Sequence, residues 1–406
     1  NDDASVTKNI VTLENSTVGT GGNVRHVFGG YSRGANGKAD GNEVTVTNTS
    51  VTGQINGGLV LGDGSASSNK VTIAGTSTIK GDVYGAHANA QTGYATTNGT
   101  LEKNEVIISG GTMEKEVYGA LSFGKGTARE NRVTISGGTL QKAVYGGMAY
   151  DAGTAKDNHI VISGGTFQGN VIGGASDGTN AVTGNTITIS GGTFSGDIKG
   201  GLSWGGGATT GNTVTLGADD GTYTATLTNS DIYGGNDTSD VTDNTLNVNA
   251  KNVAVKSVNN FENYNFKLNS SIGDGDTMLT LGTGGFGRTT DWNKFKVNIE
   301  GLPGGQGQPN RTIAVLKTGT ANALQFSNYA ARTLITDPNS DFESALRTDT
   351  GMAAATSVLL DYNRFRNNEW TYDGTTPATG DKVYGGYSSL GHTTTNNKLT
   401  VTNTNN

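Results

Sequence analysis

Apolar and polar residues alternate in short segments of this chain, and each segment follows an asparagine. After Asn185, for example, Ile187 and Ile189 are apolar while Thr186 and Thr188 are polar. A period of two is typical of a strand with one buried and one exposed face. The segments show no helical period, so the pattern predicts short β-strands.

The strand pattern recurs about every 27 residues. A second alternating run in each repeat ends in a hydrophobic residue, any residue and Gly-Gly, or a close variant. The first glycine of this motif stands at Gly29, Gly57, Gly85, Gly119, Gly146, Gly173, Gly200 and Gly234. The asparagine before the first strand stands at Asn42, Asn69, Asn104, Asn131, Asn158, Asn185, Asn212 and Asn244, with a weaker copy at Asn9. Self-similarity at a fixed period indicates a repeat architecture.

Two short strands and a loop cannot bury an apolar face alone, whereas stacked copies of such a unit can. The repeat therefore predicts an all-β fold, a right-handed parallel β-helix (β-solenoid) with coils of about 27 residues. A stretch of small polar residues closes each unit. A β-propeller is the main alternative, but its blades usually need about 40–50 residues and four strands, so the repeat is too short.

The recurring asparagines share the parity of the buried Val and Ile positions. We expect them to point inward at a corner of each coil, where stacked amides hydrogen-bond to one another and to turn backbone. A row of ligand-binding amides is the functional alternative. The paired glycines permit either a positive φ or a close approach of backbones at the corners.

The repeat divides the chain into three predicted regions. Regular solenoid repeats occupy residues 1–250, degenerate coils 251–380, and a resumed, truncated repeat 381–406. We expect a longer array in the full-length protein. Within the middle region, residues 320–372 form an irregular or helical excursion. Ser340 and Glu343 have capping-box spacing and alanine-rich sequence follows, which predicts a short helix there.

The composition of the chain excludes several kinds of functional site and partner. The chain has 406 residues, of which 65 are Gly and only 4 are Pro, with 16% charged residues and a net charge of −7. The absence of Cys excludes disulfides, thiolate metal sites and cysteine nucleophiles, and suits an exported bacterial protein. No basic stripe is present, so no nucleic-acid partner is expected. No apolar run reaches the ~18 residues of a transmembrane helix.

Residues that could carry catalysis or bind a metal are few and scattered. The histidines are His26, His87, His159 and His392. They lack paired spacing, so no metal site or other cofactor is expected. Asp219 and Asp220 form an adjacent acidic pair, and residues 273–276 read Gly-Asp-Gly-Asp, but both are typical of turns. We expect no catalytic residues and no enzyme activity.

The best candidate binding residues are tyrosines next to the inward valines of the second strands. By parity these tyrosines point outward and form a partial aromatic row that suits a glycan or a protein partner. The candidate residues are Tyr84, Tyr118, Tyr145, Tyr233 and Tyr384. The alternative is that they only stabilise the sheet. Loops on a rigid scaffold are further candidates, namely Ala86–Lys103, Gly217–Ser230 and Thr320–Tyr372.

Runs of the form N-x-V-x-I-S-G-G-T-F-x-G-x-V-Y-G-G resemble the passenger regions of bacterial autotransporters, the type V secreted surface proteins. The resemblance implies a β-helical passenger at the cell surface of a Gram-negative bacterium, either anchored at the outer membrane or secreted, and commonly an adhesin. Its partners would be host-cell or bacterial surface proteins or glycans. The family's C-terminal outer-membrane barrel is expected in the full-length protein and is absent from this sequence.

Three functional hypotheses follow. The first is a non-enzymatic adhesin or stalk that presents loops on a rigid β-helix. The second is a self-associating structural array that aggregates cells. The third is a carbohydrate-active β-helix enzyme, which needs at least two carboxylates facing a groove.

Overall fold

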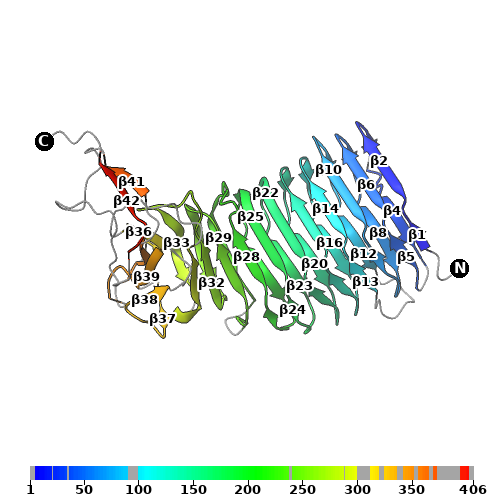
Figure 1. Cartoon of the computed structure of the whole chain (residues 1–406). Coiled ribbons are helices and arrows are strands. Elements are labelled where there is room, and N and C mark those ends of the chain that lie inside the picture. Colours follow the sequence, from blue (N-terminus) through cyan, green and yellow to red (C-terminus); the bar gives the residue numbers. More distant parts are fainter. Residues whose placement is uncertain are drawn as a thin grey trace. The chain divides into compact units, whose positions relative to one another are not determined.

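The computed structural model of the chain is all-β (Figure 1). It describes residues 5–20, 22–33, 36–89, 99–236, 240–287, 289–299, 311–319, 324–335, 342–351, 355–364, 369–372 and 394–401. Within these residues the only helix is a single 3₁₀ turn, η1 (Trp292–Lys294).

The chain divides into two compact units. Unit 1 comprises Asn1–Ala218, Tyr223–Leu246 and Val255–Asn263, and unit 2 comprises Asp219–Thr222, Asn247–Ala254 and Tyr264–Asn406. The predicted boundary at residue 250 lies where segments of the two units alternate along the chain, and the boundary at 380 lies outside the described residues.

Unit 1 is a parallel β-helix with strands on three faces. The first face holds β2 (Ile10–Glu14), β6 (Glu43–Thr47), β10 (Lys70–Ala74), β14 (Glu105–Ile108), β18 (Arg132–Ile135), β22 (His159–Phe167), β25 (Thr186–Phe194) and β28 (Thr213–Leu216), continued by the short strands β3 (Thr17–Val18), β7 (Ser50–Val51), β11 (Thr78–Ile79), β15 (Thr112–Met113) and β19 (Thr139–Leu140). The second face holds β4 (Val27–Ser32), β8 (Ile55–Leu61), β12 (Val83–Asn89), β16 (Val117–Ser122), β20 (Val144–Ala149), β23 (Val171–Ser176), β26 (Ile198–Ser203) and β29 (Leu227–Tyr233). The third face holds β5 (Lys38–Asp40), with which β1 (Ser5–Thr7) pairs, β9 (Ala66–Ser67), β13 (Thr100–Glu102), β17 (Thr127–Arg129), β21 (Thr154–Lys156), β24 (Val182–Thr183) and β27 (Thr209–Thr210).

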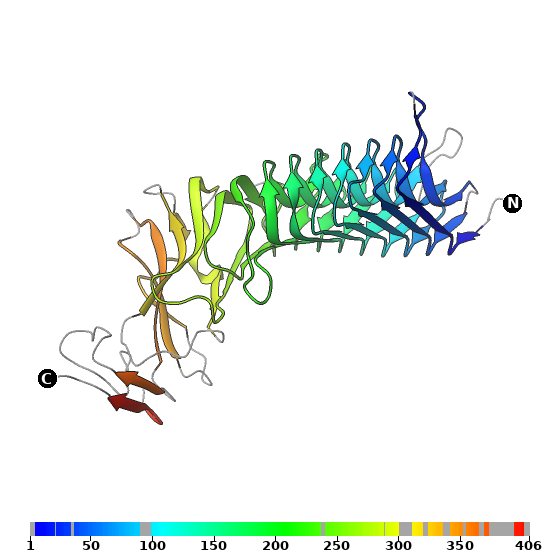
Figure 2. The ribbon, with the colours of Figure 1, turned by 90° about the horizontal axis from the view of Figure 1, so that it is seen from above.

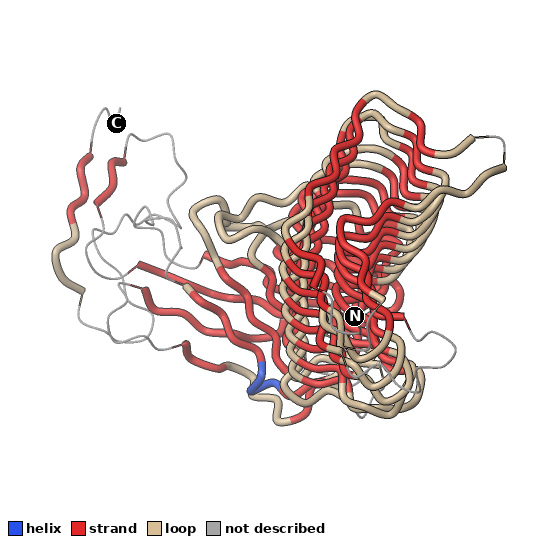
Figure 3. Tube along the Cα trace, turned by 90° about the vertical axis from the view of Figure 1, so that its right-hand side faces the viewer, coloured by secondary structure: helices blue, strands red, loops and turns tan. Residues whose placement is uncertain are grey.

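The register of these strands confirms the predicted coil. Val117, Val144, Val171 and Ile198 occupy equivalent positions on β16, β20, β23 and β26, one coil of 27 residues apart. Figure 2 shows the strands of unit 1 stacked in chain order, and they superpose in the view along the stack in Figure 3. Their inward Val, Ile, Leu and Phe side chains are buried and form the core.

The third strand of each coil was not predicted, because two strands per coil account for the alternating pattern. It lies in the stretch of small polar residues that closes the repeat. In β21 only Ala155 points inward and is buried, between Thr154 and Lys156. A strand with one small inward residue has no detectable period, and its position is set by pairing with the same segment of the adjacent coils.

The predicted asparagine corner is confirmed. Asn158 is fully buried, and its side-chain Nδ2 donates to Asn185 Oδ1 at 2.9 Å and to the carbonyl oxygen of Ala128 at 3.0 Å. Its backbone N–H also donates to Asn185 Oδ1, at 3.1 Å. The backbone and side-chain donors of Asn131 contact Asn158 Oδ1 in the same way. The equivalent asparagines from Asn9 to Asn244 continue this ladder.

The paired glycines serve the second of their two predicted roles, close approach. A Cβ atom on Gly146 would lie 2.3 Å from the carbonyl oxygen of Gly173 in the next coil. A Cβ on Gly147 would lie 2.6 Å from Nδ2 of Asn158. Neither glycine has a positive φ. Glycine is therefore required here because there is no room for a side chain, and not because the backbone adopts an unusual conformation.

Unit 2 has a mixed strand arrangement. Strands β30 (Thr245–Val248), β31 (Val253–Asn259) and β32 (Asn263–Lys267) hold residues of both units. The others are β33 (Thr277–Phe286), β34 (Thr290–Asp291), β35 (Phe295–Asn298), β36 (Arg311–Thr318), β37 (Phe326–Ser327), β38 (Thr333–Ile335), β39 (Phe342–Thr348), β40 (Ser357–Arg364), β41 (Glu369–Tyr372) and β42 (Lys398–Val401). Tyr264, Trp292, Phe295 and Phe326 pack in an aromatic core, with ring centroids of adjacent pairs 4.8 to 6.2 Å apart.

The predicted helix after Ser340 is wrong where the structure describes the chain. Strands β39 and β40 pair antiparallel, and β40 pairs antiparallel with β36. On β40, Val358, Leu360 and Tyr362 are buried at a period of two, which outweighs the local capping-box signal at Glu343. Ser340 itself lies outside the described residues.

Candidate functional site

Three of the predicted tyrosines come together on the second face of unit 1. Tyr84, Tyr118 and Tyr145 occupy equivalent positions on β12, β16 and β20. Their rings stack nearly parallel, with centroids 5.1 Å apart between Tyr84 and Tyr118 and 4.9 Å apart between Tyr118 and Tyr145. The preceding valine in each strand is buried in the core, so the tyrosines lie on the opposite, outer side, as parity predicts.

Of the other two predicted tyrosines, the structure describes only Tyr233, which is not part of this stack. Tyr233 lies beside Lys199, whose Nζ is 5.1 Å from the centre of the tyrosine ring. Tyr384 lies outside the described residues.

A second outward row packs against the tyrosines. Gly85 and Ala86 both face the inside of the coil, so the next outward residue is His87, whose ring stacks on Tyr84 with centroids 4.4 Å apart. The two rows form an outer cluster made of Tyr84, Tyr118, Leu121, Met148, Ile172, Ala175 and Leu202, with Phe123, Tyr145 and Tyr150 packed against it. The second face of unit 1 therefore carries apolar packing on both sides.

Stacking leaves little of the tyrosine rings accessible. Only 4% of Tyr84 and 8% of Tyr118 is exposed, whereas Tyr145 and Tyr150 are half-buried. Burial raises the pKa of Tyr84 and Tyr118 well above the usual tyrosine range and raises the pKa of Tyr145 to about 12. These phenols stay protonated at physiological pH, and a ligand would reach the half-buried members first.

A carboxylate lies at the edge of the outer cluster. Tyr84 Oη donates to Asp82 Oδ2 at 3.1 Å, and Gln54 Nε2 donates to the same oxygen at 3.4 Å. The backbone N–H of Glu116 donates to Asp82 Oδ1 at 3.3 Å. Asp82 is thus held by three donors from consecutive coils.

Two buried polar side chains next to Tyr84 of the outer cluster lack hydrogen-bond partners among the described residues. Both side-chain nitrogens of His87 and both amide atoms of Asn56 are unpaired. Asn56 is in register with Tyr84, one coil earlier. Burial lowers the pKa of His87 to about 4, so the imidazole is neutral at physiological pH.

The other residues considered for catalysis or metal binding have structural contacts. His26 Nδ1 accepts a hydrogen bond from the backbone N–H of Gln54 at 3.1 Å, and His159 Nδ1 lies 2.7 Å from Thr186 Oγ1. Asp220 Oδ1 accepts the backbone N–H of Thr222 at 2.9 Å, which forms a turn. Among the described residues, no three His, Asp or Glu side chains converge on a possible metal position.

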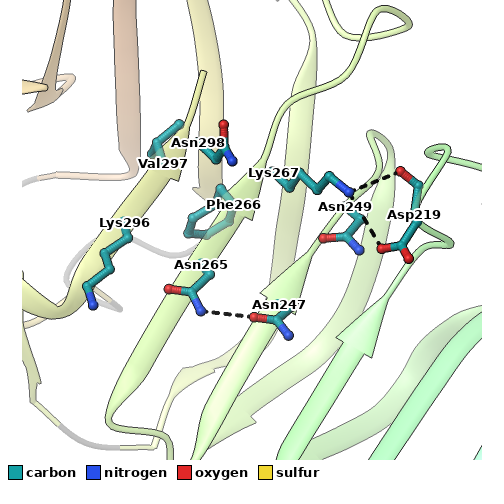
Figure 4. Close-up of a pocket in the computed structure, with 9 residues that line it drawn as sticks. All are labelled: Asp219, Asn247, Asn249, Asn265, Phe266, Lys267, Lys296, Val297 and Asn298. Atoms are coloured by element: carbon teal, nitrogen blue, oxygen red, sulfur yellow. Dashed lines mark hydrogen bonds and ion pairs between the residues drawn. The ribbon is translucent and has the colours of Figure 1, made fainter. Parts of the chain in front are cut away.

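Unit 2 carries a polar depression that sequence reasoning missed. It holds about 450 Å³ on the outer side of β30, β32 and β35 (Figure 4). Six outward side chains form its floor in two rows, which we term the amide–lysine depression: Asn247, Asn265 and Lys296, then Asn249, Lys267 and Asn298. Asp219 stands at one side, where Lys267 Nζ lies 3.5 Å from its Oδ1.

The sequence signal for this depression was present but weak. The segments "TLNVNA", "NYNFKLN" and "KFKVN" place Asn or Lys at alternate positions where the regular repeats mostly have Thr. No fixed interval links these segments, because the 27-residue period fades there. The pairing of β32 with β30 and β35 brings them together, and Asn265 Nδ2 contacts Asn247 Oδ1 at 3.0 Å.

No family model, curated protein or solved structure matches the chain. In the part of the chain that the structure describes, no helix has both the length and the apolar character to cross a membrane.

Proposed function

We propose that the chain is a non-enzymatic, surface-exposed adhesin or stalk, the passenger region of an autotransporter of a Gram-negative bacterium. Its rigid β-helix would present variable outer side chains and loops to a host-cell or bacterial surface partner. The resemblance of the repeats to autotransporter passengers supports this assignment.

The contrast between the inside and the outside of the coils supports the proposal most directly. Inward positions repeat one chemistry, with Val or Ile in the core and Asn at the corner. One outward position varies along the first face and is the same in adjacent coils only at the last step, in the order Glu43, Lys70, Glu105, Arg132, His159, Thr186 and Thr213. A fixed interior with a varied exterior is what a display scaffold requires.

An adhesion assay with the full chain tests the proposal. The purified chain is coupled to fluorescent beads, which are applied to epithelial cells and to Gram-negative bacteria, with albumin-coated beads as the control. Saturable adhesion that soluble chain competes away is the expected result. Beads that clump with one another and adhere to neither surface would contradict the adhesin proposal and favour a self-associating array.

A further inference from the structure

One asparagine of the amide–lysine depression presents its side-chain amide to the depression. Only 7% of Asn249 is exposed, and its side chain lines the depression. Its backbone carbonyl accepts Asn269 Nδ2 at 2.8 Å, but its side-chain amide makes no hydrogen bond with a described residue. This amide can therefore both donate a hydrogen bond to and accept one from a polar group bound in the depression.

One positive charge in the depression is uncompensated. Lys267 is neutralised by Asp219, whose Oδ1 and backbone carbonyl lie 3.5 and 3.4 Å from Lys267 Nζ. Lys296 is exposed and has no ion pair or hydrogen bond with a described residue. Figure 4 shows Lys296 at the opposite side of the depression from Asp219. The site therefore suits a ligand with a single negative charge at the Lys296 end.

The rest of the floor is made of amides. An asparagine side chain both donates and accepts hydrogen bonds, which is the complement of a hydroxyl group. Asn247 and Asn265 are already oriented by their mutual hydrogen bond at 3.0 Å. A volume of about 450 Å³ lies toward the small end of ligand sites.

We propose that the amide–lysine depression binds a carboxylated sugar residue of an acidic polysaccharide. The carboxylate contacts Lys296 Nζ, and the sugar hydroxyls contact the amides of Asn249, Asn247 and Asn265. This inference rests on the proposed adhesin function, because it names the class of glycan that the adhesin recognises.

Calorimetric titration of the full chain tests the proposal. The probes are a galacturonic acid trisaccharide and the neutral trisaccharide made by reducing its carboxyl groups. We expect the neutral sugar to bind at least about tenfold more weakly, because a charge-assisted hydrogen bond is lost. Affinity for the acidic sugar should also fall with rising salt.

Two variants and a matched control locate the site. Lys296→Gln removes the charge from an exposed side chain and should weaken binding of the acidic sugar about tenfold. Asn249→Ala should weaken it severalfold, with circular dichroism to confirm folding. Lys317→Gln changes another exposed lysine on a strand of unit 2, outside the depression, and should leave affinity unchanged.

Three results would overturn the site. These are equal binding of the neutral sugar, wild-type affinity in Lys296→Gln, or equally tight binding of a triglutamate peptide, which would show that charge alone is recognised. The adhesion assay separates this outcome from failure of the proposed function. Adhesion that persists without acidic-sugar binding overturns only the site, whereas sugar binding without adhesion overturns only the adhesin role. Shortening of the trisaccharide in the same samples, detected by chromatography, would contradict a non-enzymatic function.

Discussion

At the corner of each regular coil, one asparagine contacts three neighbours. Asn158 accepts both donors of Asn131, donates to Asn185 and donates to the carbonyl of Ala128. Inside a low-dielectric core such connected hydrogen bonds are strong, and an unpaired member is costly. Parity in the sequence predicted the inward position of the asparagines. The third contact could not be predicted, because it involves a strand with no periodic signal.

Replacing Asn158 with Ala should destabilise unit 1 markedly. The change leaves the donors of Asn131 and an acceptor on Asn185 unpaired, which should lower the free energy of unfolding by about 2–4 kcal/mol. Urea denaturation followed by circular dichroism measures the effect. The control is Gln141→Ala, which removes an exposed amide from the same repeat. Equal stability of the two variants would contradict a structural role for the ladder.

His87 should make stability depend on pH. The unfolded chain binds a proton near the ordinary histidine pKa of 6.5, whereas the folded chain binds it only near pH 4. Between these values the unfolded state holds more protons, so acidification favours unfolding, by up to about 1.4 kcal/mol per pH unit. The contribution is fully present above pH 6.5 and declines toward pH 4.

The matched variant for this prediction is His87→Leu. The equivalent positions in the adjacent coils are Leu59 and Leu121, so the side chain fits and two unpaired buried nitrogens are removed. Urea midpoints measured from pH 7 to pH 4 should fall less steeply in the variant than in the wild type. Identical slopes would show that His87 is not buried in the neutral form.

At the scale of elements, the second face bends where two consecutive residues face inward. The bend brings the outward rows of Tyr84 and His87 together and produces the outer cluster. The sequence predicted that the tyrosines point outward, but strict alternation gives no reason for the next row to lie against them. Their burial therefore could not be predicted. The helix after Ser340 failed for a related reason, since the pairing of β39 with β40 joins segments across an intervening turn.

The two glycines of the corner should differ in tolerance to a side chain. Gly146→Ala places a Cβ 2.3 Å from the carbonyl oxygen of Gly173, and we expect a loss of roughly 3 kcal/mol, as for overpacked cores. Gly147→Ala should cost less, because Ala86 and Ala120 occupy the equivalent of this second position in earlier coils. Thermal unfolding of both variants makes the comparison, and a larger loss at Gly147 would contradict it.

At the scale of the whole molecule, the sequence predicted the architecture of unit 1 better than that of unit 2. The same strand register recurs in every coil of a repeat. An ambiguous position in one coil can therefore be interpreted from the equivalent positions in the others. Unit 2 has no such redundancy, and its antiparallel strands and aromatic core depend on contacts between unrelated segments. The amide–lysine depression lies in this part, which explains why the tyrosines were predicted as a site and the depression was not.

Charges of alternating sign on the first face should stabilise the stacking of neighbouring coils. Glu43, Lys70, Glu105 and Arg132 alternate in sign in one register, and Lys70 Nζ lies 3.7 Å from Glu105 Oε2. Lys70→Glu would place three acidic residues side by side, and should lower the free energy of unfolding by about 1 kcal/mol at low salt.

The effect of Lys70→Glu should shrink in high salt, because exposed charges are screened. Lys142→Glu serves as the control, since Lys142 is exposed and forms no ion pair with a described residue. Urea denaturation at low and high ionic strength makes the measurement. A loss that is independent of salt would indicate a packing defect in place of charge repulsion.

The asparagine ladder also gives unit 1 a polarity. Along the column from Asn9 to Asn244, every amide-to-amide hydrogen bond runs in one direction, with the Nδ2 donor on the earlier coil and the Oδ1 acceptor on the later one. Between two coils, the amide-to-amide bonds of this column therefore have their donors on the earlier coil and their acceptors on the later coil, while the later amide donates back to a carbonyl oxygen such as that of Ala128. An added coil therefore continues the column only when its Oδ1 faces the Nδ2 donor of the last asparagine. The amide-to-amide bonds of the column thus define a direction along the β-helix axis. Further coils can extend the column in only one orientation.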